Sequence, residues 1–499
     1  MTTPQGPFFE FLELIRSVKA ADQSVYCVGG AVRDLLLNRP IHDVDFVTDR
    51  DVFALARSVA DRTRGGFYVL DAQRKIGRVL LPTGQGVQDE PTTLDFARLR
   101  GEGIEQDLLQ RDFSIDAMAV DVEDTSHLID PLHGQADLLA RVLRPCSRDS
   151  FEEDPVRVVR AARLAPLLGF HLEEGTPAAI RRAAPGLARV SGERKRDELF
   201  RILEDNTVVS SLRLLENFGA LPFLIPEFAA VQERRLTLEG EPRVGDLAYR
   251  SLDALQELLA GLVEEYHEEN VGSVALGEAV LVLGRFRPRL REHFAQALHS
   301  QRPRIAVLRL GLLLRWSGLA DVPLAGGEQA RVALARRSAE LGEQCGRALA
   351  LSNKELRYLS VLLAGQYDLT DVLQQDGDLT GAQIYRFFRT NGPGGVDLCL
   401  FSLAAYWGTH ATAIPIEEWR ALLGVCRSLL EGWWERHDEV IEPPKWLDGD
   451  EIVRITGLEA GPELGHLIAQ LHEASADGRI RSREGAERFV REVTSGERN

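Results

Sequence analysis

The spacing of hydrophobic residues divides the chain into two parts. Between residues 24 and 130, short runs rich in β-branched and aromatic residues alternate with helical patterns such as AVRDLLL, which predicts a mixed α/β region. Beyond about residue 135, apolar residues recur at spacings of three and four, with Gly or Pro at the breaks, a pattern typical of helices. The sequence thus predicts a small α/β head followed by a long helical body. The predicted strands of the head are 24–28, 44–47, 67–70 and 92–96.

Composition narrows the class of protein without fixing its function. The chain has 499 residues, 44% hydrophobic and 27% charged, as expected for a globular protein that buries a large core without disulfide or metal cross-links. Its five cysteines are widely spaced and form no C-x-x-C pair, so neither a disulfide framework nor a zinc ribbon is predicted, and a reducing cytoplasm fits. No apolar run approaches the roughly 18 residues that span a bilayer, so we expect no membrane segment. A formal net charge of −17 argues against coating nucleic acid by bulk charge, although a local basic surface can still bind phosphate.

The most informative segment is VGGAVRDLLLNRPIHDVDFV, residues 28–47. Asp43 and Asp45 lie two apart in a predicted strand, so their side chains leave the same face. If they point into water, their repulsion is tolerable and carries no information. If they converge in a cleft, a divalent cation between them is the best explanation, and Mg²⁺ with phosphates suits such oxygen ligands. Gly29 and Gly30 lie between a predicted strand and a predicted helix. The pair either forms a plain tight turn or lets the backbone approach a phosphate closely, and in the second case Arg33 would face the same anion.

This segment closely resembles the head motif of class II tRNA nucleotidyltransferases, the CCA-adding enzymes, and of the related bacterial poly(A) polymerases. The resemblance implies an α+β fold: a polymerase-β-like nucleotidyltransferase head, with a small mixed sheet and helices, followed by a mostly α-helical body. It also implies that Asp43 and Asp45 hold Mg²⁺ while an RNA 3′-hydroxyl attacks the α-phosphate of a nucleotide. Gly29, Gly30 and Arg33 would then contact the triphosphate. Asp95, in TTLDFARLR, lies where family members carry a further acidic residue on a neighbouring strand.

A second segment, QRDFSIDAMAVDV at residues 110–122, resembles the family motif R-R-D-F-T-I-N-A-M-A, which contacts ribose and phosphates. Arg111 and Asp112 match the motif and are predicted to bind the nucleotide. Gln110 replaces the first arginine of the motif, and Asp116 replaces an asparagine. Because an aspartate lacks the amide donor of asparagine, a hydrogen bond that needs this donor is not expected at position 116. Apart from the resemblance, the less favoured alternative for Asp112 is a helix N-cap.

A third segment, EEDPVRVVRAARLAPLLGF at residues 152–170, begins as an ordinary helix would, with Asp154 at the N-cap and Pro155 at the first position. Its arginines recur at every third position and form one ridge on the helix. Three stacked arginines repel one another unless something anionic lies along them. The ridge consists of Arg157, Arg160 and Arg163.

The same segment resembles the family motif E-D-x-x-R, which selects the incoming base without a nucleic-acid template. The resemblance implies that Asp154 and Arg157 pair with the hydrogen-bonding edge of the base and that Glu153 orients them. It assigns Arg160 and Arg163 to nearby phosphate or to bracing the helix. Residues 155–201 contain ten Lys or Arg against five Asp or Glu, a basic surface suited to the triphosphate and the acceptor end of an RNA.

The stretch between Asp95 and Arg111 is shorter than in family members that complete CCA, and this resembles the CC-adding subgroup, which leaves the terminal A to a separate enzyme. Loop lengths also vary between homologues for trivial reasons. The resulting prediction is a Mg²⁺-dependent enzyme that adds CC, or full CCA, to the tRNA 3′ end from CTP and ATP. The alternatives are a poly(A) polymerase, although the C-terminus is not strongly basic, and an RNA-binding protein whose catalytic head has decayed.

The helical body resembles the HD-type domain of many family members, including an L-S-N-K-E segment within 348–359. Arg315 and Trp316 occupy the place of the His-Asp metal pair, which argues against phosphohydrolase activity. Residues 446–471 resemble the closing tail that grips the tRNA body. The expected domains are a head at 1–135, a nucleotide-selecting neck at 136–235, a helical body at 236–440 and a tRNA-binding tail at 441–499.

Overall fold

The chain folds into two compact units. One comprises Met1–Val190 and Ser210–Ala220, and the other comprises Ser191–Val209 and Leu221–Asn499. The predicted division into four domains stays a prediction. No helix within the described residues is long and apolar enough to cross a membrane. The computed structural model describes residues 7–41, 43–82, 92–236, 242–264, 273–299, 302–323, 327–372, 379–410 and 413–496.

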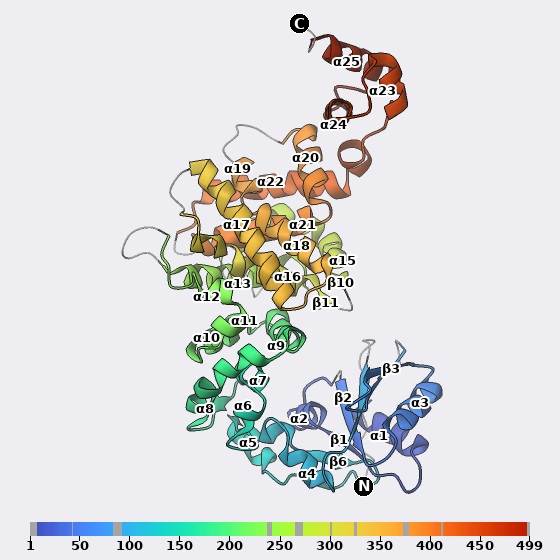
Figure 1. Ribbon diagram of the computed structural model, residues 1–499, viewed down its shortest axis with the longest axis vertical. Helices are drawn as coiled ribbons and strands as arrows, with labels where there is room; N and C mark the ends of the chain where they lie inside the picture. The colour runs from blue at the N-terminus through green and yellow to red at the C-terminus, as the bar shows by residue number, and fades with distance from the viewer. Residues whose placement is uncertain are drawn as a thin grey trace. The chain divides into compact units, whose positions relative to one another are not determined.

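A seven-stranded mixed sheet forms the centre of the first unit, with the strand order β3-β4-β5-β2-β1-β6-β7 (Figure 1, blue). β2 and β5 run parallel, and the other neighbours are antiparallel. All four predicted strands are confirmed as β1, β2, β3 and β5, whereas β4, β6 and β7 were not predicted. The strands are β1 Val25–Val28, β2 Asp43–Thr48, β3 Gly66–Asp71, β4 Ile76–Leu80, β5 Thr93–Arg98, β6 Ala119–Asp121 and β7 Leu128–Ile129.

The two faces of this sheet differ in chemistry because side chains alternate along each strand. On one face Val44, Phe46, Leu94 and Phe96 are almost fully buried, and the rings of Phe46 and Phe96 stack with centroids 5.4 Å apart. Helix α3 (Val52–Thr63) contacts β3, β4 and β5, and α1 (Pro7–Val18) contacts α3. The alternation leaves the aspartates of β2 on the opposite face.

The rest of the first unit is mostly helical, as predicted. Helix α7, which carries the arginine ridge, ends at Gly169, whose φ of 67° is the left-handed conformation that glycine adopts readily. The helices are α2 Gly30–Leu36, α4 Ile104–Leu109, η1 Ser114–Asp116, α5 Gly134–Ala140, α6 Ser150–Glu153, α7 Val156–Leu168, α8 Thr176–Ala183, η2 Ala184–Arg189 and α10 Val208–Asn217.

The second unit is built from helices around the buried α21 (Gly394–Thr409), which packs against α13 (Val244–Leu262). The Gly/Pro-rich segment at 392–395, predicted as a joint between domains, is the turn between α20 (Gly381–Asn391) and α21. The other predicted joint, 239–246, lies partly outside the described residues. Other long helices are α9 Gly192–Glu204, α14 Val274–Leu283, α15 Arg287–Ala295, α16 Arg304–Leu314, α17 Gly327–Ala348, α18 Asn353–Ala364 and α22 Ile416–Trp434.

The end of the chain has a hydrophobic core of its own. Buried side chains that include Leu467, Leu471 and Val490 pack together there. Three helices supply them, and they follow the PPKW segment that was predicted to open a last helical part. They are α23 Gly449–Thr456, α24 Pro462–Ala476 and α25 Arg483–Gly496.

The HD-like region holds buried polar residues rather than metal ligands. Arg315 and Trp316 are both buried, and the guanidinium carbon lies 4.4 Å from the indole centroid. Burial lowers the pKa of Arg315. In the L-S-N-K-E segment, Ser352 and Glu355 form a capping box at the start of α18. Among the described residues there is no group of three or more His, Cys, Asp or Glu that could hold a metal ion.

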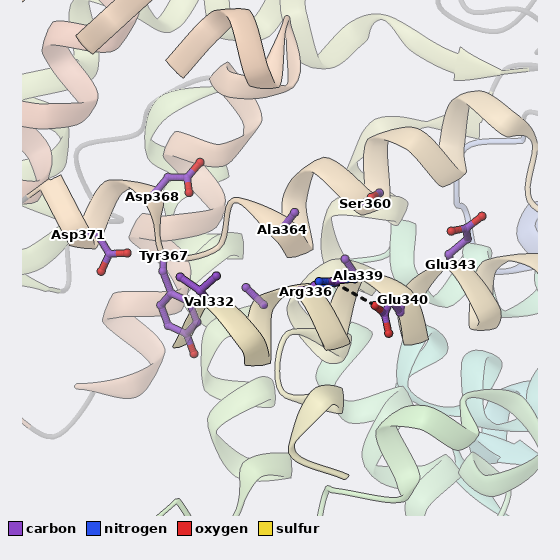
Figure 2. A pocket seen from close by; sticks show the side chains of 11 residues that line it. Val332, Arg336, Ala339, Glu340, Glu343, Ser360, Ala364, Tyr367, Asp368 and Asp371 are labelled. Carbon is purple, nitrogen blue, oxygen red and sulfur yellow. Dashed lines mark hydrogen bonds and ion pairs between the residues drawn. The ribbon is translucent and has the colours of Figure 1, made fainter. Parts of the chain in front are cut away.

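A surface pocket of about 500 Å³ lies between α17, α18 and the short α19 (Asp368–Val372). Figure 2 shows its acidic side chains, Glu343 among them, and the pairing of Arg336 with Glu340. The Arg336 Nε lies 3.3 Å from Glu340 Oε1. The pocket belongs to the second unit and carries part of the chain's negative charge.

Candidate active site

Three predicted acidic residues lie on one face of the sheet. In the parallel pair of β2 and β5, Asp45 lies directly opposite Asp95, and Asp43 lies opposite Thr93. Neighbouring strands are about 4.8 Å apart, so the carboxylates of Asp45 and Asp95 project side by side. The side chains of Asp43 and Asp45 are exposed. The structure therefore places carboxylates from adjacent strands on one face of the sheet.

Arg78 on β4 completes this row and was missed by sequence reasoning. It lies opposite Asp95 in the antiparallel pair of β4 and β5. Its Nε donates to Asp95 Oδ1 at 2.8 Å and its Nη2 donates to Asp95 Oδ2 at 2.7 Å. The hydrogen bonds to Asp95 raise the pKa of Arg78, and the charges of Asp43 and Asp45 raise it further. The Asp95 carboxylate of the row is thus held by a fixed cation.

Gly29 brings two of the predicted motifs together at the turn between β1 and α2. Its φ is +77°, a conformation that L side chains rarely adopt. A Cβ atom at this position would lie 3.0 Å from Arg111 Nη1 and 3.5 Å from Asp45 Oδ2. The turn is tight, and it allows the Asp45 carboxylate and the Arg111 guanidinium to approach the same backbone atoms. Arg111 is itself held by the buried Asp107, with Nη2 3.1 Å from Oδ2.

Arg33 is engaged within the protein rather than open to solvent. Its Nη1 lies 2.6 Å from Asp116 Oδ1, and its Nε lies 2.9 Å from Asp34 Oδ1. Burial opposes the charge, but Asp116 and Asp34 raise the pKa of Arg33 above its ordinary value. The guanidinium lies over Gly30, where an added Cβ would be 3.4 Å from Nη2. Asp116, the residue that departs from the family motif, therefore acts as the counterion of Arg33.

Asp112 is the anion that lies along the arginine ridge of α7. Its Oδ1 is 2.5 Å from Arg157 Nε, and its Oδ2 accepts a hydrogen bond from Arg160. The alternative role of helix N-cap is wrong, because η1 begins at Ser114 with Phe113 at the N-cap. The repulsion expected between neighbouring arginines is therefore relieved by a carboxylate of the second motif.

Arg157 makes further contacts that fix its orientation. The side chain is buried, and Nη1 donates to the carbonyl oxygen of Ser150 at 3.1 Å and to its Oγ at 2.8 Å. Nη2 donates to the carbonyl oxygen of Gln110 at 3.0 Å. The last residue of α6, Glu153, is largely exposed, with Oε2 3.9 Å from Arg157 Nη1. Asp154, between α6 and α7, is half-buried and accepts from the backbone N–H of Val156 at 3.4 Å.

Two cysteines border the site and are held as neutral thiols. Burial raises the pKa of Cys27, with a further contribution from the charge of Asp45. Burial likewise raises the pKa of Cys146 to about 12, and the charges of Asp112 and Asp116 add to the effect. All five cysteines of the chain are free.

Comparison with known proteins agrees with this geometry. The family described as the Poly A polymerase head domain matches residues 25–144, which contain the sheet, the carboxylate row and the turn at Gly29. A second family, described as a probable RNA and SrmB-binding site of polymerase A, matches residues 169–232. Together the fold and the site define a nucleotidyltransferase with a polymerase-type head.

More specific similarity covers nearly the whole chain. A CC-adding tRNA nucleotidyltransferase of Geobacter sulfurreducens is 30% identical over 466 residues, which cover 93% of this chain and 90% of that protein. The chain therefore belongs to the tRNA nucleotidyltransferase family, and the predicted enzyme class is confirmed. An A-adding tRNA nucleotidyltransferase of Deinococcus radiodurans is 29% identical over 478 residues, 93% of this chain and 94% of the relative.

A solved structure, a CCA-adding enzyme in complex with CTP, shares the fold. Its TM-score is 0.59 at 21% identity, over 98% of this chain and 96% of that one. The predicted fold class, with a polymerase-β-like head and a mostly helical body, is thus confirmed. Dependence on a divalent metal is general in this nucleotidyltransferase family.

Proposed function

We propose that this enzyme adds cytidines from CTP to the 3′ end of tRNA, without a nucleic-acid template, and stops after CC. A separate A-adding enzyme would complete the end in the same cytoplasm. The observation that carries CC specificity is the short, fixed connection between β5 and α4, residues 99–103. Similarity to the CC-adding enzyme of Geobacter sulfurreducens supports the same proposal.

This connection is held at several points along its length. The backbone N–H of Leu99 donates to the carbonyl oxygen of Thr48 at 2.9 Å, and Arg100 Nε donates to Asp107 Oδ1 at 2.9 Å. The N–H of Glu102 donates to Gln106 Oε1 at 2.8 Å. These bonds leave a tight turn where family members that complete CCA carry a longer flexible loop. The loss of that loop removes the element expected to switch the selector from C to A.

The residues that would hold Mg²⁺ are Asp43 and Asp45. Both are exposed carboxylates on one face of β2, and hard oxygen ligands with open positions suit Mg²⁺ bound to phosphates. Such an ion supplies charge neutralisation at the leaving pyrophosphate and acidifies the attacking 3′-hydroxyl. Asp95, paired with Arg78, is the further acidic residue beside them on the neighbouring strand. Gly29, Gly30, Arg33 and Arg111 line the approach to the triphosphate.

The base would be selected by Asp154 and Arg157, with Glu153 beside them. A selector must present its donors and acceptors in one geometry, since each misplaced hydrogen bond weakens discrimination. The contacts of Arg157 with Asp112, Ser150 and the Gln110 carbonyl supply that rigidity. Arg160 shares the Asp112 carboxylate, so we assign it to bracing α7. Arg163, one turn farther along the ridge, is assigned to phosphate.

A second candidate is addition of the terminal A, favoured by the similarity to the A-adding enzyme of Deinococcus radiodurans. A panel of acceptors separates the two. Purified protein and Mg²⁺ are incubated with either CTP or ATP and one of three forms of the same tRNA. The first form lacks CCA, the second ends after the first C, and the third ends after CC. We expect CTP to extend the first two acceptors and neither nucleotide to extend the third. Extension of the CC-ended tRNA by ATP alone would establish A addition. If neither nucleotide extends any of the three acceptors, the alternative of an RNA-binding protein with a decayed catalytic head is favoured instead.

A further inference from the structure

The row of charged residues on the open face of the sheet continues onto its edge strand. Cross-strand register aligns Asp45 with Asp95, Asp95 with Arg78, and Arg78 with Tyr68 of β3. Residues directly opposite one another in neighbouring strands project from the same face. Tyr68 therefore shares the face that carries the carboxylates. At about 4.8 Å between strands, its backbone lies roughly 10 Å from that of Asp95 and roughly 14 Å from that of Asp45.

The Tyr68 ring contacts its own strand and is half exposed. A Cβ added at Gly66 would lie 3.0 Å from Tyr68 Cε2 and 3.2 Å from its hydroxyl oxygen, so the ring lies over the glycine of its own strand. The residue is nevertheless 54% exposed. By contrast, the preceding Phe67 projects from the opposite face, where its ring centroid is 6.3 Å from that of Phe53 on α3. An aromatic ring that rests against the backbone of its own strand and is still half exposed is suited to stacking with a planar ligand.

The charges around Tyr68 favour a nucleic acid as that ligand. Beside it Arg78 is paired with Asp95, and the turn between β3 and β4 adds the exposed Arg74 and Lys75. Cations that follow a backbone beside an exposed aromatic ring are the usual combination for binding single-stranded RNA. The incoming nucleotide is not the occupant, because its base is assigned to the selector on α7. The spacing from the carboxylates suits a nucleotide upstream of the reacting 3′ end.

We propose that Tyr68 is a stacking platform for a base of the RNA substrate near its 3′ end. The inference rests on the proposed function, since it identifies the occupant from the RNA that the enzyme extends. Tyr68 acts in binding: it positions the acceptor strand and touches no reacting atom.

The test compares three variants of the full-length enzyme. Tyr68→Ala removes the ring, Tyr68→Phe keeps it, and Val69→Ala is a matched control at the next position of the same strand, where the residue is 47% exposed and projects from the other face. For Tyr68→Ala we expect the KM for tRNA lacking CCA to rise about five- to a hundredfold, the range for one lost base stack. The kcat at saturating RNA and the KM for CTP should not change. Tyr68→Phe and Val69→Ala should behave as the wild type.

A second measurement identifies the base. RNAs with a single abasic site at each of the last few 3′ positions are titrated by fluorescence anisotropy against wild type and Tyr68→Ala. At one position, the abasic site should weaken binding to the wild type by the same factor as the Tyr68→Ala substitution weakens binding of the intact RNA. The same abasic site should not weaken binding to Tyr68→Ala any further, because both changes remove the same stack. The proposal would be overturned if an active Tyr68→Ala enzyme bound RNA with unchanged affinity. It would also be overturned if every abasic site weakened binding to Tyr68→Ala as much as it weakens binding to the wild type. So would a change in oligomeric state without a change in RNA affinity, which would assign the face to a second copy of the chain. Failure of the wild type to incorporate CTP refutes the proposed function instead.

Discussion

Replacing Arg157 by Ala should destabilise the first unit strongly. The guanidinium is 10% exposed and contacts Asp112, which is 15% exposed, at 2.5 Å, together with Ser150 and the Gln110 carbonyl. Removing one partner of a buried ion pair typically costs about 3–5 kcal/mol, because the remaining carboxylate and carbonyls lose their donors. A surface pair would cost about 0–1 kcal/mol. Since Arg160 still contacts Asp112, we expect the lower end of the larger range, about 3 kcal/mol.

Thermal unfolding followed by circular dichroism measures this effect. For a unit of this size, about 3 kcal/mol corresponds to a fall in Tm of roughly 6–12 °C. Arg182→Ala is the matched control: Arg182 pairs with Glu152 at 3.0 Å, but its side chain is 66% exposed, so its loss should cost less than about 1 kcal/mol. A Tm for Arg157→Ala within about 2 °C of the wild type would refute the buried contact network.

A second substitution of Arg157 tests its role in nucleotide selection, and it has to separate a loss of stability from a loss of discrimination between nucleotides. Arg157→Lys retains a positive charge but not the planar fork that matches a base edge. Assayed well below its Tm, this variant should incorporate CTP more slowly and accept other nucleotides more readily. Full discrimination at a reduced rate would contradict the selector role and leave Arg157 as a structural residue.

Three other predictions concern single residues of the head. Asp45→Asn should abolish CTP incorporation without changing the circular dichroism spectrum, and residual activity would contradict the assignment of Asp45 to the metal. The control is Asp51→Ala, which removes the N-cap of α3; it should lower the free energy of unfolding by about 1 kcal/mol and retain activity. Asp116→Asn removes the charge opposite Arg33, so the KM for CTP should fall, and a rise would show that Asp116 assists binding. Burial opposes the charge of Asp107, but Arg100 and Arg111 lower its pKa below 3.8. Its stabilising contribution is therefore present above that pH and is lost as the pH falls through the lower folded-state pKa. Urea midpoints of Asp107→Asn should be less sensitive to pH in that window than those of the wild type, and equal sensitivity would contradict the assignment.

The strands and the catalytic motifs could be predicted because their signals are local. The alternation of Asp43 and Asp45 with buried residues, and the glycine pair before a helical pattern, are both readable within twenty residues. Strand β4 was missed because IGRVL contains a glycine and an arginine, which weaken the β signal. With it, the Arg78 contact to Asp95 was missed.

The pairings that shape the site are long-range, and no local pattern specifies them. Arg33 and Asp116 are separated by 83 positions, and Asp112 and Arg160 by 48. The arginine ridge did indicate that an anion must lie along α7, but only the fold shows that this anion is Asp112. For the same reason, Tyr68 was unremarkable in the sequence and became informative once the register of β3 placed it beside Arg78.

CC-specific addition is tested most directly by the length of the product when both CTP and ATP are present. A tRNA lacking its last three nucleotides is incubated with the enzyme, Mg²⁺, CTP and ATP, and the products are resolved at single-nucleotide length. We predict that a product two nucleotides longer than the acceptor accumulates, that both added nucleotides are cytidine, and that it does not grow further at long times. A product extended by three nucleotides and ending in A would contradict this prediction, because the short turn between β5 and α4 would then not prevent the switch from C to A.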